Sequence, residues 1–173
     1  MPTQTYAQRR AALDEVLARV ARRQTGTDSY HNDPVQPLPA AFTDTGELLT
    51  TAHYLWHSHL GARIDAALES VDTPADAIRQ AYRDAAQAMP ELRDLLDRYA
   101  GHPVLARAEQ RELALLAQAA GMATPSTPPD RAAALGRQLQ SAAIAEARAA
   151  APAPRPRRPH RRWLCRLRNA LAA

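Results

Sequence analysis

Residues 47–71, ELLTTAHYLWHSHLGARIDAALESV, decide the fold class of this chain. Their large apolar side chains recur at helical spacing, and polar side chains fill the positions between them. Such spacing gives an α-helix one apolar and one polar side, so an amphipathic helix is predicted, with Asp44 or Thr45 capping its start. The apolar face comprises Leu49, Trp56, Leu60, Ile64, Ala67 and Val71, and the opposite face comprises Tyr54, Ser58, Asp65 and Glu69.

The sequence on both sides of this segment is divided by proline and glycine at positions typical of helix ends. Proline favours the first turn of a helix and glycine favours the residue after its last turn. Further helices are therefore predicted over residues 3–24, from Pro74 to Pro90, from Pro90 to Gly101, from Pro103 to Gly121, and over residues 128–150.

The composition agrees with a helical protein. Alanine and leucine dominate, whereas the chain has one Phe, two Trp and five Tyr, and few β-branched residues. Strands favour the residue types that are scarce here. The predicted fold is therefore all-α: a five- to six-helix orthogonal bundle with a long loop near its N-terminal side and an extended basic C-terminal arm.

Three regions are predicted along the chain. Residues 1–121 form a helical body, which includes a long Pro-, Gly- and Asp-rich loop at 25–46 that we expect to be a partly ordered strap. Residues 122–150 are a linker followed by a helix, which is expected to pack weakly because its large apolar residues are few. Residues 151–173 are a separate basic Pro/Arg arm with a short amphipathic helix.

Positive charge is concentrated in that arm. All 22 basic residues are arginine, which we interpret mainly as the codon bias of a GC-rich, bacterial genome. Residues 1–150 carry 15 arginines and all 18 acidic residues, a formal charge of −3, whereas residues 151–173 carry seven arginines and no acid, a charge of +7. Such a partition predicts that the arm contacts something anionic.

The arm combines this charge with an apolar face. Residues 161–173, RRWLCRLRNALAA, predict a helix that is marginal alone in water and orders when its apolar face is buried. The predicted contact residues for nucleic acid or another anionic surface are Arg155, Arg157, Arg158, Arg161, Arg162, Trp163, Arg166 and Arg168. The predicted apolar docking face comprises Trp163, Leu164, Leu167 and Leu171.

Several partners fit such an arm, and the leading prediction is nucleic acid. Arginines would contact phosphates and Trp163 would stack on a base. A peripheral membrane protein would instead bury residues 161–171 at an anionic lipid surface. A protein partner could bind the apolar face of the arm in a groove. The last interpretation is that the arm is a solvated tail without a partner. The helical body could form a homodimer.

A histidine group suggests a rival function. His53 and His57 lie one helical turn apart, as two metal ligands would, whereas His59 lies on another face. A metal- or haem-dependent helical enzyme is therefore the alternative from another class. The simpler interpretation is two partly buried histidines with hydrogen-bonded neighbours, and a pH-sensing contact is the third.

Catalytic motifs are otherwise missing from the sequence. Carboxylate pairs such as Glu109 and Glu112 have arginines within a turn, which predicts surface ion pairing and not acid–base chemistry. There is no nucleophile elbow and no Gly-rich phosphate loop, and Cys165 is interpreted as a plain thiol of the arm. We therefore predict an interaction or regulatory protein without a cofactor, and favour a non-catalytic role over an enzymatic one.

Two further expectations concern DNA binding and location. The turn at residues 100–103 joins two predicted helices as in a helix-turn-helix, but the acidic residues of the second helix favour an ordinary αα-hairpin. The chain begins without an apolar leader and has no stretch of 18 apolar residues, so a cytoplasmic location is expected.

Overall fold

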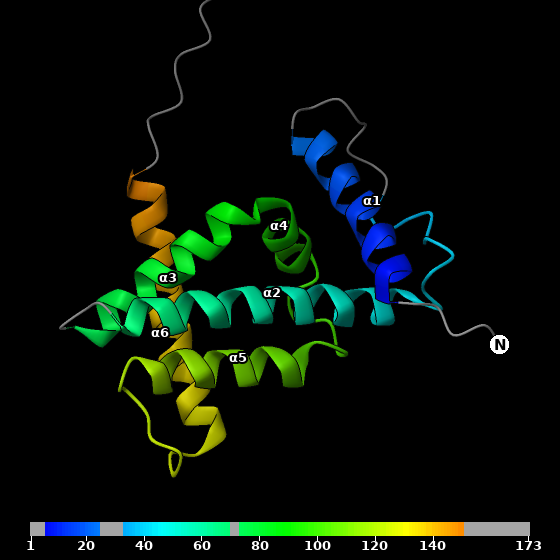
Figure 1. Cartoon of the computed structure of the whole chain (residues 1–173). Helices are drawn as coiled ribbons and strands as arrows, with labels where there is room; N and C mark the ends of the chain where they lie inside the picture. The colour runs from blue at the N-terminus through cyan, green and yellow to red at the C-terminus, as the bar shows by residue number, and fades with distance from the viewer. Residues whose placement is uncertain (1–5, 25–32, 70–72, 151–173) are drawn as a thin grey trace, which may run out of the picture.

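The computed structural model describes residues 6–24, 33–69 and 73–150, and this part of the chain is all-α, without β-strands. Helix α2 runs through the middle, with α1 and α4 on one side of it and α5 on the other, and α6 crosses α5 and α3 (Figure 1). The helices are α1 (Tyr6–Gln24), α2 (Thr45–Leu68), α3 (Pro74–Ala88), α4 (Pro90–Arg98), α5 (Ala106–Ala119) and α6 (Pro129–Ala150). The all-α prediction is confirmed.

Helix α2 has the two faces that the sequence predicts. Asp44 is its N-cap, and its side chain accepts a hydrogen bond from the backbone N–H of Glu47 at 2.8 Å. The polar face is exposed to solvent, while Trp56 is completely buried at the centre of the core. The buried residues are Leu48, Leu49, Ala52, His53, Trp56, Leu60 and Ile64. Since α2 also packs against α3, α4 and α5, it organises the bundle.

The predicted helix ends are mostly confirmed. Pro74 and Pro90 occupy the first turns of α3 and α4, and Gly101 and Gly121 follow α4 and α5 with positive φ angles of 79° and 71°. Only glycine adopts such angles without strain, which explains its use there. The expected start of α5 at Pro103 is wrong, because residues 102–105 form a separate turn in which the Leu105 N–H donates to the His102 carbonyl.

Helix α6 packs far more closely than its few large apolar residues suggested. Its buried side is built from small residues, and Gly136 lies against the backbone of Leu113 in α5. Leu139 and Ala143 join the main core, and α6 also packs against α3. A narrow apolar stripe of small side chains lets two helices approach closely, so it indicates tight rather than loose packing here.

The described part of the predicted strap, residues 33–44, is anchored to the body. Val35 and Phe42 are buried in the main core and Leu38 packs against it, as expected. Arg19 of α1 donates a hydrogen bond of 3.1 Å to the carbonyl of Pro37. These contacts tie the segment to the body before α2 begins.

Helices α4 and α5 do not pack as the predicted αα-hairpin. Helix α4 lies mainly against α1 and α2, whereas the principal neighbour of α5 is α6. Helices α5 and α6, which are joined by the turn at residues 120–128, therefore form the closely packed helix pair in this half of the molecule (Figure 1). Nothing in this arrangement presents α5 as the second helix of a helix-turn-helix.

Candidate functional site

A buried ionisable cluster joins α2 to α5. His53 and Trp56 lie one turn apart on the buried face of α2, and Glu112 faces them from α5. The exposed fractions of His53 and Glu112 are 8% and 4%. Glu112 Oε1 accepts a hydrogen bond of 3.0 Å from Trp56 Nε1, and Glu112 Oε2 lies 3.1 Å from His53 Nε2. One carboxylate thus engages two side chains from the neighbouring helix.

These contacts lower the pKa of Glu112. Burial alone would raise the pKa of its carboxyl, because a charge is costly away from water. The contacts with His53 and Trp56, together with the positive charge of Arg93, outweigh burial and hold the pKa below its ordinary value. Glu112 is therefore a buried carboxylate that remains charged at neutral pH.

A second layer of side chains surrounds Trp56. The ring of Tyr82 meets the indole edge-to-face with centroids 5.7 Å apart, and the guanidinium carbon of Arg93 lies 4.9 Å from the indole centroid. Gln140 of α6 donates a hydrogen bond of 3.0 Å to the Tyr82 hydroxyl. Arg93 is itself ion-paired with Asp97 at 2.9 Å. All of α2 to α6 therefore contribute to one polar network around a buried tryptophan.

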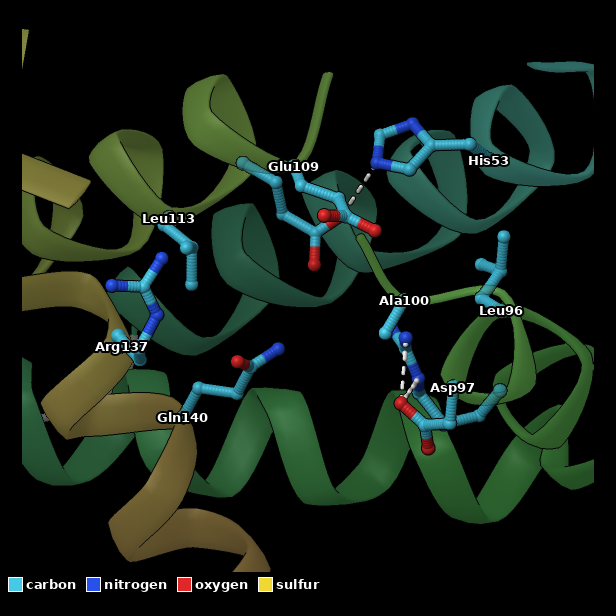
Figure 2. A pocket seen from close by; sticks show the side chains of 10 residues that line it. His53, Leu96, Asp97, Ala100, Glu109, Leu113, Arg137 and Gln140 are labelled. Atoms are coloured by element: carbon cyan, nitrogen blue, oxygen red, sulfur yellow. Dashed lines mark hydrogen bonds and ion pairs between the residues drawn. The ribbon is translucent and has the colours of Figure 1, made fainter. Parts of the chain in front are cut away.

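The cluster opens into a polar cavity of about 180 Å³. Figure 2 shows His53 and Glu109 on one side of the cavity, Arg137 and Gln140 of α6 on another, and Asp97 of α4 at the far end. The lining residues are His53, Arg93, Leu96, Asp97, Ala100, Glu109, Glu112, Leu113, Arg137 and Gln140. Both signs of charge line this space, so it favours neither an anion nor a cation.

His53 also borders a second cavity, of about 240 Å³, that is lined by residues of α2 and α5 and of the turn before α5. Its lining is mostly apolar and comprises Thr50, His53, Tyr54, His57, Val104, Leu105, Ala108 and Arg111. The buried imidazole therefore lines both a polar and an apolar cavity, and Glu112, which contacts it, lines the polar one.

The structure brings His53 and His57 together but adds no further ligand. Their rings are stacked with centroids 6.3 Å apart and an interplanar angle of 14°. Within the described ranges, no group of three or more His, Cys, Asp or Glu side chains is arranged to hold a metal ion. The metal or haem site stays a prediction, and elemental analysis with an absorption spectrum of untagged protein tests it.

The surface role predicted for Glu112 is wrong, whereas other predicted pairs are confirmed. Arg98 and Asp94 form an exposed ion pair at 3.0 Å, as the spacing of charges indicated. Glu112 instead turns inward, away from the exposed Arg111 beside it. The sequence held a signal for this, since Glu112 is four residues after Ala108 and four before Leu116, and such spacing puts the three side chains on one face of the helix.

The arm lies outside the described residues, and so do all of its predicted contact residues, from Arg155 to Leu171. None of the described helices combines the length and apolarity needed to cross a bilayer. Comparisons of the chain with models of known protein families, with curated proteins and with solved structures give no match.

Proposed function

We propose that this chain is a non-catalytic helical interaction protein of the bacterial cytoplasm, whose basic arm (residues 151–173) docks on nucleic acid. The observation that carries the proposal is the charge partition, with +7 on the arm and −3 on residues 1–150. An arm of that charge is attracted to a polyanion, whereas the acidic body is not.

The ion pairs of the body support the proposal that the arm, and not the body, binds nucleic acid. Several acidic residues of the body are engaged by its own arginines, which reduces their capacity to neutralise the arm. The exposed or half-buried pairs are Arg9–Glu47, Arg10–Asp14, Arg79–Asp76, Arg79–Glu146, Arg83–Glu146, Arg93–Asp97 and Arg98–Asp94. The arm contains no acid with which its arginines could pair locally.

Salt dependence gives this proposal a quantitative test. Each phosphate contact releases condensed counterions, so the logarithm of affinity falls linearly with the logarithm of salt concentration, with a slope of about −0.9 per contact. Seven arginine–phosphate contacts would give a slope of up to about −6. Base stacking by Trp163 would add affinity without changing this slope.

Replacing four arm arginines by glutamine is expected to make that slope shallower by roughly 3.6, because four phosphate contacts are lost. The variant carries Arg155→Gln, Arg157→Gln, Arg158→Gln and Arg161→Gln. Fluorescence anisotropy of a labelled mixed-sequence DNA duplex, titrated with the full chain at several salt concentrations, measures the slope.

A matched control removes the same charge from the body. Arg63, Arg107, Arg131 and Arg148 are exposed and form no ion pair with another described residue, so their replacement by glutamine leaves the fold intact. The control should keep the wild-type slope. Equal losses in the two variants would show that DNA senses only total charge, and the arm would not be the docking site.

A membrane surface is the second candidate, and the apolar face of residues 161–171 favours it. Arginine attraction to anionic lipid is worth about 1 kcal/mol per residue, and Trp163 with the leucines would enter the interface. Co-sedimentation with anionic and with neutral liposomes distinguishes this candidate from DNA binding. Stronger binding to anionic liposomes than to DNA at equal salt would replace nucleic acid by lipid as the partner.

A further inference from the structure

The cavity between α2 and α5 has a lining of one charge sign. Its basic side chains are His53 and His57 of α2 and Arg111 of α5, and no Asp or Glu lines it. Glu112 lies outside this lining, with its carboxylate oxygens engaged by Trp56 and His53. In a body with a net negative formal charge, this cavity is therefore a local site for a negative group.

The guanidinium of Arg111, which lines this cavity, is available to bind a ligand. Arg111 is exposed, and within the described part of the chain no carboxylate lies at ion-pair distance from its guanidinium. A guanidinium presents several N–H donors in a plane, which matches the two oxygens of a carboxylate. His57, half-buried one turn beyond His53, adds an imidazole N–H donor to this lining.

The remaining wall is apolar and partly uncovered. Tyr54 and Val104 are 64% and 44% exposed, and both border this cavity. Leu105 and Ala108 complete the apolar wall. Covering such a surface with a hydrocarbon group would remove apolar area from water and favour binding.

We infer that this cavity binds a small carboxylate with a hydrocarbon body. Its volume of about 240 Å³ is close to the lower limit of ligand sites, roughly 300 Å³. The carboxylate would meet Arg111 and His57, and the hydrocarbon would lie against Val104, Leu105 and Ala108. Both walls belong to the described body, from α2, α5 and the turn that precedes α5.

Benzoate is the probe that tests this inference, with two analogues that each lack one feature. Benzyl alcohol keeps the aromatic body without the charge, and acetate keeps the charge without the aromatic body. Amide shifts in two-dimensional NMR spectra of the full chain report where and how tightly each binds. Saturable binding of benzoate that shifts resonances of α2 and α5, with clearly weaker binding of both analogues, is the expected result.

The variant Arg111→Gln should weaken benzoate binding roughly tenfold, since one hydrogen-bonded charge pair is lost. Arg107→Gln is the matched control, because Arg107 is exposed one turn earlier on α5 and lines neither cavity. The control should bind as the wild type does. The inference is overturned by no saturable binding at millimolar benzoate, by equal losses in both variants, or by acetate shifting the same resonances as strongly.

Discussion

Replacing Gly136 by alanine is expected to lower the free energy of unfolding by about 3 kcal/mol, at the upper end of the usual cost of overpacking. A Cβ at this position would lie 1.8 Å from the carbonyl oxygen and 2.5 Å from the carbonyl carbon of Leu113. These are backbone atoms inside α5, so no side chain can rotate away to make room. The interface can accept the methyl group only if α6 moves off α5.

The loss should be measured by urea unfolding followed by far-UV circular dichroism. For a chain of this size, about 3 kcal/mol corresponds to a fall in melting temperature of roughly 6–12 °C. Helix content should change little, because alanine favours the helical conformation of α6 more than glycine does, even though the docking of α6 on α5 is weakened.

Gly61→Ala is the matched control, because it makes the same substitution inside α2. A Cβ at Gly61 would meet nothing within 4 Å, and the position is only half-buried. Alanine there restricts the unfolded chain and favours the helix, so stability should rise by about 0.5–1 kcal/mol. If both alanine variants changed stability in the same direction, the close contact between α5 and α6 would be refuted.

The helices could be predicted from the sequence because their signals are local. Asp44 caps α2, and Pro74 and Pro90 begin α3 and α4, because each of these residues suits its backbone position irrespective of distant contacts. Gly101 and Gly121 end helices for the same kind of reason. The start of α5 was misplaced because a turn at residues 102–105 also begins near a proline.

The packing of α6 could not be predicted by counting large apolar residues. That criterion favours helices that bury leucine and isoleucine, whereas α6 buries Ala132, Ala133 and Gly136 against its neighbours. The contribution of a small residue depends on how closely the facing backbone approaches, which is a property of the folded pair of helices. The close packing of α6 is recognised only from the position of Gly136 against the backbone of Leu113.

Only part of the candidate site could be predicted from the sequence. His53 and His57 were identified from their spacing, and they do lie together on α2. The partner of His53 was missed, because Glu112 is separated from Trp56 by 56 residues and stands directly after Arg111 in the sequence. Local charge spacing predicts ion pairs within one helix, but it carries no information about a carboxylate that faces a different helix.

Replacing Glu112 by leucine should lower the free energy of unfolding by about 3 kcal/mol, because it leaves buried polar groups without partners. The Trp56 N–H would lose its acceptor, and His53 would lose the carboxylate beside Nε2. Glu112→Gln should cost less, since an amide oxygen can still accept from the indole. Glu109→Gln, one turn away on the same helix, is the control and should be close to neutral, because no side-chain hydrogen bond or ion pair joins the Glu109 carboxylate to another described residue, and its backbone bond to Leu105 is unaffected.

The pH dependence of Glu112→Gln separates the charge of this carboxylate from its shape. The folded-state pKa of Glu112 is lower than its ordinary value of 4.5, so its ionisation stabilises the folded protein above pH 4.5, and this stabilisation is lost as the pH falls through the lowered pKa. Urea unfolding of the wild type and of Glu112→Gln, from neutral pH to well below 4.5, should therefore show the two stabilities converging in acid. A constant difference between them at every pH would mean that the buried carboxylate contributes by its hydrogen-bonding shape alone and that its charge does not hold α5 against α2.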